Sequence, residues 1–138
     1  MNVVIDANLL VVLVHEESRS QRVRNKFNEW IRDDVKIHAP NLVQYEVANA
    51  LTRLVSANRF PQQQLAQAWI LLNRLTITYH DLSEGTRIIE IALSLKRQSA
   101  YDASYIALAE TLDADLWTLD TPLYRNSLQY GFPVHLVE

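Results

Sequence analysis

Apolar residues along the chain follow two different periods, one typical of strands and the other typical of helices. Five short runs are rich in β-branched or aromatic residues and are bounded by Asp, Asn or Pro. These runs occupy residues 3–5, 35–39, 76–79, 115–119 and 133–137. The sequence therefore predicts five β-strands.

Between these runs the apolar residues recur with a helical period. Residues 18–34 carry one apolar stripe opposite a charged face, made of Val23, Phe27, Trp30 and Ile31. Residues 40–59 are mostly apolar, which predicts a helix buried on more than one side. Further helices are expected after Pro61, over 83–97 and over 101–113. Their apolar positions at helical spacing include Leu65, Ala68, Trp69, Leu72, Ile88, Ile91, Ala92 and Leu95.

Strands that alternate with helices predict an α/β fold with a mainly parallel five-stranded sheet and helices on both faces. The 138 residues, 49% of them apolar, can bury one substantial core, so we expect a single domain over 1–138. The apolar run at residues 1–14 carries Asp6 and Asn8 and has no basic leader. We therefore expect neither a signal peptide nor a membrane span.

Composition narrows the classes of function. The absence of cysteine excludes a disulfide framework and a thiolate metal site, and it fits a reducing cytoplasm. With only Gly85 and Gly131, the chain lacks the glycine-rich phosphate loops of nucleotide-binding folds. The formal net charge is -3, so binding of nucleic acid would have to rely on local basic patches.

Four acidic residues are expected at one edge of the sheet. Parallel strands end at the same edge, where open α/β folds bind their ligands. Asp6 and Asp120 end two of the strands, and Glu46 lies little more than one turn into the helix after the second strand. The helix that starts near Asp102 is joined to the fourth strand by a residue or two, so it runs antiparallel to that strand and begins at the same edge.

Carboxylates that converge repel one another unless a cation lies between them. Oxygen ligands without cysteine or a helical histidine pair favour a hard divalent ion, Mg²⁺ or Mn²⁺. Such an ion can activate a bound water and stabilise charge on a phosphate. The four acids therefore predict metal-dependent hydrolysis of a phosphodiester bond.

Each acid also has a purely structural interpretation. Ser99 and Asp102 fit the capping-box pattern, and Asp6 and Asp120 each precede a helical segment as N-caps do. The structural interpretation of Glu46 is that of an exposed acid on the helix surface. For a single acid the cap is the favoured interpretation, but four separate caps have no reason to fall at one edge of one sheet. Their conjunction favours a shared site.

Other polar and aromatic residues receive weaker assignments. The four histidines are assigned no chemical role. His15 and His80 are expected in loops, His38 in a strand, and His135 near the C-terminus. The first long helix carries a basic face made of Arg19, Arg22, Arg24 and Lys26. Charged helix faces of this kind are usually only solvated. Lys96 and Arg97 precede Asp102 and are placed to contact a nucleic-acid phosphate. Trp30 and Trp69 are expected in the core.

Three stretches are informative together: "VVIDAN" at the start, "APNLVQYEVANAL" in the second quarter, and "YDASYIALAETLDADLWTLD" in the last third. In order and spacing they resemble the PIN-domain nucleases, especially the VapC-type toxins of bacterial toxin–antitoxin pairs. The resemblance covers nearly the whole chain. It implies that Asp6, Glu46, Asp102 and Asp120 form an acidic quartet that holds Mg²⁺ or Mn²⁺.

The resemblance also implies supporting residues and partners. Asn8 and Thr118 match positions where the family places small polar residues that orient the acids or a metal-bound water. The implied activity is that of an endoribonuclease, active as a homodimer and neutralised by a small antitoxin protein whose tail occupies the active-site groove. Two features depart from the family. Asp113 and Asp115 flank a turn that commonly contains glycine, and Trp117 replaces a small aliphatic residue.

The leading hypothesis is therefore a metal-dependent endoribonuclease of the PIN fold, acting on RNA as a toxin. Two alternatives keep the fold: a nuclease of RNA processing or DNA repair, and a protein that binds partners or RNA without cutting. A phospho-receiver signalling domain is a third alternative, favoured only by Asp81 after the third strand. It would need an acid pair after the first strand and a lysine closing the last, and residues 133–138 contain no lysine.

Overall fold

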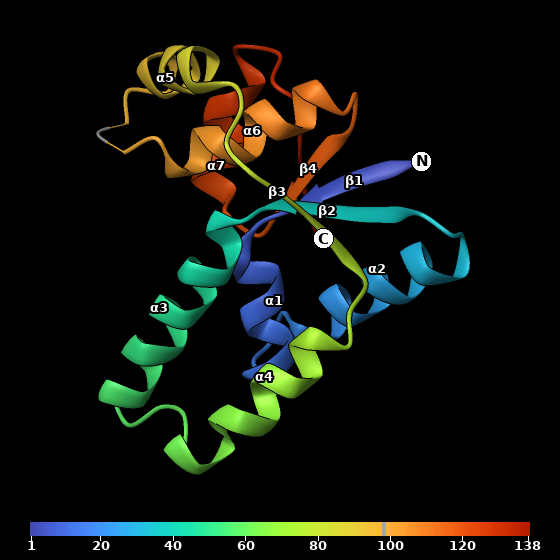
Figure 1. The fold of residues 1–138 in the computed structure, drawn as a ribbon, viewed down its shortest axis with the longest axis vertical. Helices are drawn as coiled ribbons and strands as arrows, with labels where there is room; N and C mark the ends of the chain where they lie inside the picture. Colours follow the sequence, from blue (N-terminus) through green and yellow to red (C-terminus); the bar gives the residue numbers. More distant parts are fainter. Residues whose placement is uncertain (98) are drawn as a thin grey trace.

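The computed structural model describes residues 1–97 and 99–138, and its centre is a five-stranded sheet (Figure 1). The strands are β1 (Asn2–Ile5), β2 (Lys36–Pro40), β3 (Ile77–His80), β4 (Asp115–Thr118) and β5 (Val134–Leu136). They lie in the order β3-β2-β1-β4-β5, and every neighbouring pair is parallel. The five strands predicted from the hydrophobic pattern are confirmed, and the sheet is wholly parallel.

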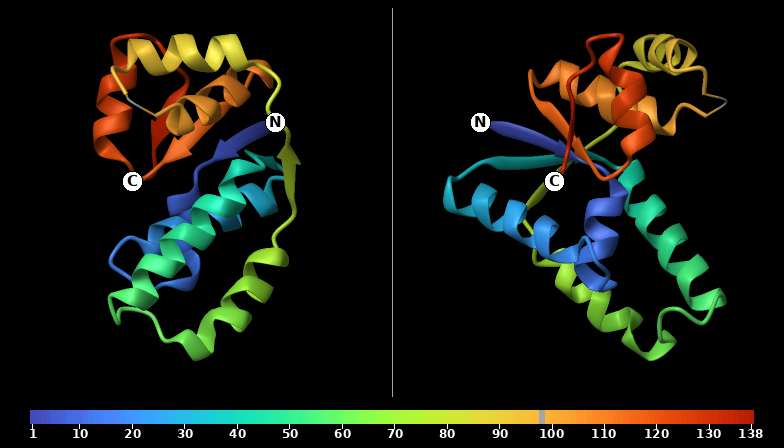
Figure 2. Two further views of the ribbon diagram at one scale, coloured as in Figure 1. Left: turned by 60° about the vertical axis from the view of Figure 1, so that its left-hand side comes forward. Right: turned by 180° about the vertical axis from the view of Figure 1, so that it is seen from behind.

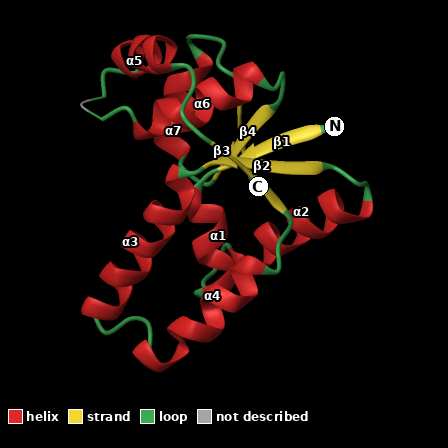
Figure 3. Ribbon diagram, in the orientation of Figure 1, coloured by secondary structure: helices red, strands yellow, loops and turns green. Residues whose placement is uncertain are grey.

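Helices cover both faces of this sheet, as the α/β prediction required (Figure 3). They are α1 (Ala7–Val14), α2 (Ser20–Arg32), α3 (Leu42–Ser56), a short 3-10 turn η1 (Gln62–Gln64), α4 (Leu65–Asn73), α5 (Gly85–Ser94), α6 (Tyr101–Thr111) and α7 (Thr121–Leu128). In both views of Figure 2, α1 to α4 lie on one side of the sheet and α5 to α7 on the other. Within the described residues, no helix combines the length and apolar character needed to cross a bilayer.

The central strand β1 determines where the site forms. It pairs with β2 on one side and with β4 on the other, and Val4 faces His38 and Leu116 in the two neighbours. Its apolar residues Val4 and Ile5 are fully buried. α6 packs on β1, β2 and β4, while α1 packs against α2, α3 and α4 in the opposite layer. Because parallel strands are joined by crossovers, the five carboxyl ends meet at one edge.

Four sequence predictions about these elements are wrong in detail. α3 is buried on one side only, because its buried residues Val43, Val47 and Leu51 form a single stripe at helical spacing. Ile31 is 63% exposed, because it lies one helical step beyond the buried stripe of Val23, Phe27 and Trp30. Trp69 is 36% exposed, because α4 lies at the end of its layer and this side chain lines an open groove beside α3. His80 ends β3 rather than lying in a loop, and its Nε2 atom is 2.9 Å from Nδ1 of His38.

Candidate metal centre at the carboxyl edge of the sheet

Asp6 and Asp120 lie at the ends of the neighbouring strands β1 and β4. Asp6 is the N-cap of α1 and accepts a hydrogen bond from the Leu9 amide at 3.4 Å. Asp120 is the N-cap of α7 and accepts from the Leu123 amide at 2.9 Å. Both predicted caps are confirmed. Since each carboxylate caps its helix through Oδ1, capping does not preclude a second role for either residue.

The Thr118 hydroxyl joins these two acids. Thr118 is fully buried, and its Oγ1 donates to Oδ2 of Asp6 at 2.5 Å while accepting the Asp120 amide at 3.0 Å. The register explains the contact, because Ile5 pairs with Trp117 and the next residue of each strand is therefore also adjacent. Thr118 thus fixes the Asp6 carboxylate relative to the start of α7.

Asp102 lies in the first turn of α6 but does not cap it. The N-cap position is Ala100, whose side chain makes no capping hydrogen bond. Ser99 instead accepts the Tyr101 amide at 3.2 Å. The capping box predicted as the structural alternative for Asp102 is therefore wrong. Its carboxylate lies 3.9 Å from Arg97, and both side chains are more than one third exposed.

Glu46 is partly buried on α3, and its Oε1 accepts a hydrogen bond from the Tyr105 hydroxyl at 2.5 Å. The Tyr105 side chain is buried, on the same face of α6 as Asp102 and one turn further along. Tyr105 is not among the site residues predicted from the sequence. The available signal was its position three residues after Asp102, which points a phenol toward the same edge.

Electrostatic coupling unites the four acids. Burial raises the pKa of Asp6 to about 7; hydrogen bonds from Thr118 and Leu9 oppose the rise, and the charges of Asp102 and Asp120 add to it. Burial also raises the pKa of Glu46, where the Tyr105 hydroxyl opposes the rise and Asp102 adds to it. The pKa of Asp102 is raised by burial and by Asp120, while Arg97 lowers it. A neighbouring acid therefore contributes to the raised pKa of each of these three carboxyl groups.

The four carboxylates are oxygen donors of the kind that a hard cation prefers, although they do not lie at ligand distance from one common point. Among the described residues, no three carboxylates or imidazoles lie at the spacing of a metal-binding group. Each carboxylate instead has its own partner: Thr118 for Asp6, Tyr105 for Glu46, Arg97 for Asp102 and the Leu123 amide for Asp120. Burial and neighbouring acids raise the pKa values of Asp6, Glu46 and Asp102, and a divalent cation would stabilise such carboxylates in their charged form.

The supporting residues lie near this edge with different exposures. Asn8 is exposed in the first turn of α1, two residues after Asp6. Lys96 is exposed after α5, in a left-handed backbone conformation. Arg97 is the cation in contact with Asp102. Asp113 and Asp115 lie at the opposite end of β4, away from the acids, as the sequence predicted.

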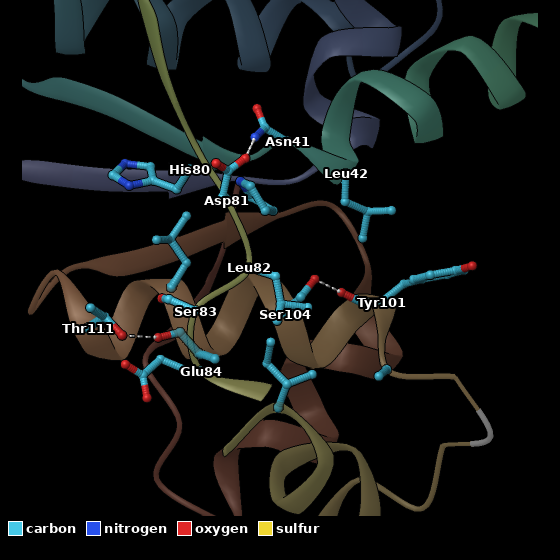
Figure 4. Close-up of a pocket in the computed structure, with 15 residues that line it drawn as sticks. Asn41, Leu42, His80, Asp81, Leu82, Ser83, Glu84, Tyr101, Ser104 and Thr111 are labelled. Carbon is cyan, nitrogen blue, oxygen red and sulfur yellow. Dashed lines mark hydrogen bonds between the residues drawn. The ribbon is translucent and has the colours of Figure 1, made fainter. Parts of the chain in front are cut away.

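A pocket of about 310 Å³ adjoins the edge between the start of α3, the segment after β3, and α6 (Figure 4). Asn41 donates a hydrogen bond to Asp81 on one side of it, and Ser104 and Thr111 of α6 lie on the other. Its lining is mostly apolar. Leu82 and Tyr101, which contribute to that lining, are 74% and 58% exposed.

Comparison with known proteins agrees with this architecture. A family model described as the PIN domain matches residues 3–127. Ribonuclease VapC9 of Mycobacterium tuberculosis is 40% identical over 89 residues, which cover 64% of this chain and 68% of VapC9. Ribonuclease VapC3 of Pyrobaculum aerophilum is 30% identical over 128 residues, which cover 89% of this chain and 92% of VapC3.

Among solved structures, VapBC2 from Rickettsia felis, bound to a promoter DNA fragment, aligns with a TM-score of 0.72 and 12% identity over the whole of both chains. At this identity the likeness concerns the fold alone. The family match spans nearly the whole sequence, so the chain belongs to the PIN-domain family. Within that family its relatives are VapC ribonucleases. The phospho-receiver alternative is therefore wrong.

Proposed function

We propose that this protein is a Mg²⁺- or Mn²⁺-dependent endoribonuclease and the toxin of a VapBC-type toxin–antitoxin pair, acting in the cytoplasm. The observation that carries the proposal is that Asp6 and Asp120, joined by the Thr118 hydroxyl, follow neighbouring strands at the carboxyl edge, where the charges of Asp102 and Asp120 help to raise the pKa of Asp6. The kinship to VapC ribonucleases supports RNA as the substrate.

Each residue has a distinct task in this proposal. Asp6, Glu46, Asp102 and Asp120 hold the cation. When bound, the cation supplies an activated water and stabilises charge on the scissile phosphate. Thr118 holds Asp6 in position by the hydrogen bond to its Oδ2 atom, and α6 and α3 present Asp102 and Glu46 from the flanks of the sheet.

Asn8 is exposed and lies two residues after Asp6. In this proposal its side chain orients a water or an acid at the carboxyl edge. Lys96 and Arg97 lie on the approach to Asp102 and are assigned to contact a phosphate of the RNA. Local cations of this kind are needed because the formal net charge of the chain is -3. Arg97 also lowers the pKa of Asp102 and so favours its charged, ligating form.

The proposal includes two protein partners. A small antitoxin would cover the acidic edge, in keeping with the VapBC complex that shares the fold. A second copy of the chain would cover the apolar pocket beside it, where Leu82 and Tyr101 expose large apolar surfaces. Sedimentation of the wild-type protein and of Leu82→Ser tests the second copy, with a dimer expected only for the wild type.

Cleavage of a long single-stranded RNA in the presence of Mg²⁺ or Mn²⁺ tests the proposed activity. We expect the wild type to cut and Asp102→Asn to be inactive with its fold retained, because Asp102 makes no capping bond that the substitution would remove. Asp113→Asn, an exposed change at the opposite edge, is the matched control and should cut normally. Equal cleavage by Asp102→Asn and the wild type would refute the assignment.

Two alternatives have separate outcomes. A PIN protein that binds RNA without cutting would show binding but no cleavage by the wild type with either metal. A nuclease of RNA processing would cut, but its expression would not arrest a bacterial host. A toxin should arrest growth, and co-expression of a small DNA-binding protein encoded beside it should restore growth.

A further inference from the structure

A cluster of aromatic and basic side chains on the β4–β5 side is not used by the metal centre. Trp117 and His135 are register partners on neighbouring strands, so their side chains point to the same side of the sheet. Their rings stack with centroids 5.1 Å apart and 28° between the planes. Trp30 of α2 meets Trp117 edge-on at 5.9 Å. The Trp117 indole, which departs from the family pattern, therefore packs against Trp30 of α2 and stacks on the His135 ring.

A cation lies directly over this indole. Lys26 Nζ is 4.1 Å from the centroid of Trp117, and it also lies 3.3 Å from Glu29. A hollow of about 350 Å³ opens beside these groups, and Lys26, Trp117, Tyr124 and His135 contribute to its lining. Unlike the apolar pocket of Figure 4, this hollow is lined mostly by polar atoms. We call these four residues the Trp117 platform.

The Trp117 platform is continuous with the carboxyl edge. Val137 lines the same hollow, and its amide donates to the Thr118 carbonyl at 2.9 Å, although the Trp117 and Thr118 side chains point to opposite faces of the sheet. Tyr124 lies one turn into α7, and its amide donates to the Asp120 carbonyl at 3.0 Å. A strand of RNA leaving the metal centre past Asp120 would therefore meet the platform next.

The chemistry of the Trp117 platform suits an unpaired nucleotide. Proteins bind single-stranded RNA by stacking its bases on aromatic rings, histidine included, and by placing lysine or arginine near its phosphates. His135 is half exposed and offers its outer face for stacking, with Trp117 behind it. Lys26 supplies the cation, and Arg22 lies exposed on the same helix one turn earlier. Two acids border the platform, since Glu138 lines the hollow and Oδ1 of Asp115 lies 3.3 Å from Nε2 of His135. Their charges repel a phosphate, which leaves the Lys26 side as its place.

We propose that the Trp117 platform binds an unpaired base of the RNA substrate next to the scissile site, with the phosphate of that nucleotide at Lys26. This inference rests on the proposed function, because it assumes that RNA is the substrate. It gives a role to Lys26 and to Trp117, neither of which the metal centre uses, whereas Arg19 and Arg24 of the predicted basic face are paired with Glu17 and Glu16.

The test measures fluorescence anisotropy of labelled eight-nucleotide oligo(A) and oligo(U) with the wild-type protein in EDTA, where no cleavage occurs. Trp117→Leu should weaken binding about 5- to 150-fold, the range found for loss of a base–aromatic stack. Lys26→Gln should reduce the slope of log affinity against log salt concentration by about 0.7. His135→Ala removes the exposed ring from an edge strand without touching the core, so it guards against a folding defect of Trp117→Leu.

Matched controls are Trp69→Leu, a partly exposed tryptophan on α4, and Lys36→Gln, an exposed lysine at the start of β2. Both should bind RNA as the wild type does. Wild-type affinity in all three platform variants, or no RNA binding by the wild type, would overturn the inference. So would variants that retain RNA binding but lose the antitoxin, since the platform would then contact protein.

Cleavage with Mn²⁺ is scored separately and distinguishes this inference from the proposed function. If the wild type binds RNA through the Trp117 platform but does not cut it, the proposed nuclease activity fails and the platform stands. If the wild type cuts RNA and the platform variants bind and cut equally well, the platform fails and the nuclease stands.

Discussion

Replacing Asp6 by Asn should stabilise the metal-free protein above neutral pH. Burial raises the pKa of Asp6 from its ordinary 3.8 to about 7, so the folded state resists ionisation of this group. The stability associated with the neutral carboxyl is present at acidic pH and is lost as pH rises from about 4 through about 7. The difference between the two pKa values corresponds to at most about 4 kcal/mol. Because Asp6 retains some exposure, we expect a gain of about 2 to 4 kcal/mol at pH 8.

Asparagine suits this test because it keeps the local structure. Its side-chain oxygen can cap α1 through the Leu9 amide, and its amide can donate to Oγ1 of Thr118. Urea unfolding in EDTA at pH 4 and pH 8 measures the effect, with Asp113→Asn as an exposed control. At pH 4 the variant and the wild type should be equal. Addition of Mn²⁺ should reverse the order at pH 8, because only the wild type gains from binding. A variant no more stable than the wild type at pH 8 in EDTA would refute the reasoning.

Three further predictions concern the groups around the acids. Thr118→Val should reduce Mn²⁺ affinity or RNA cleavage about 10- to 100-fold, and Thr118→Ser should restore it. Equal cleavage by Thr118→Val and the wild type would show that Thr118 has no role in the site. Mn²⁺ affinity should rise with pH through about 7 and then level, with release of a proton from Asp6 that calorimetry in two buffers detects; a flat profile from pH 6 to 8 contradicts this. Tyr105→Phe should lower the free energy of unfolding by about 1 kcal/mol in urea, and an unchanged midpoint would mean that its bond to Glu46 contributes nothing.

The fold was predictable because the spacing of apolar residues along the chain indicates which side of each strand or helix is buried. Runs of β-branched residues marked all five strands, since a parallel sheet covered on both faces needs continuous apolar strands. Strand direction then placed Asp6 and Asp120 at one edge before any distance was known. Trp69 shows the limit of this reasoning: a helical stripe has the same pattern whether it faces the core or an open groove.

The contacts that orient the acids were less predictable. Thr118 could be identified as a supporting residue, but its bond to Asp6 depends on the β1–β4 pairing, which joins residues 112 positions apart. Tyr105 lies among apolar residues of α6, and its donation to Glu46 depends on how α6 and α3 meet across the edge. The Ser99–Asp102 capping box failed because α6 begins at Tyr101, which makes Ala100 the N-cap instead of Ser99 and places Asp102 one position too early to complete the box.

The central claim is that the four acids form one metal site, and calorimetric titration of Mn²⁺ tests it most directly. Wild-type protein and an Asp6→Asn, Asp102→Asn double variant would be titrated at pH 8, after circular dichroism has shown that both are folded. We predict saturable Mn²⁺ binding by the wild type and its loss in the double variant. Equal binding by both proteins, or binding by neither, would contradict the account.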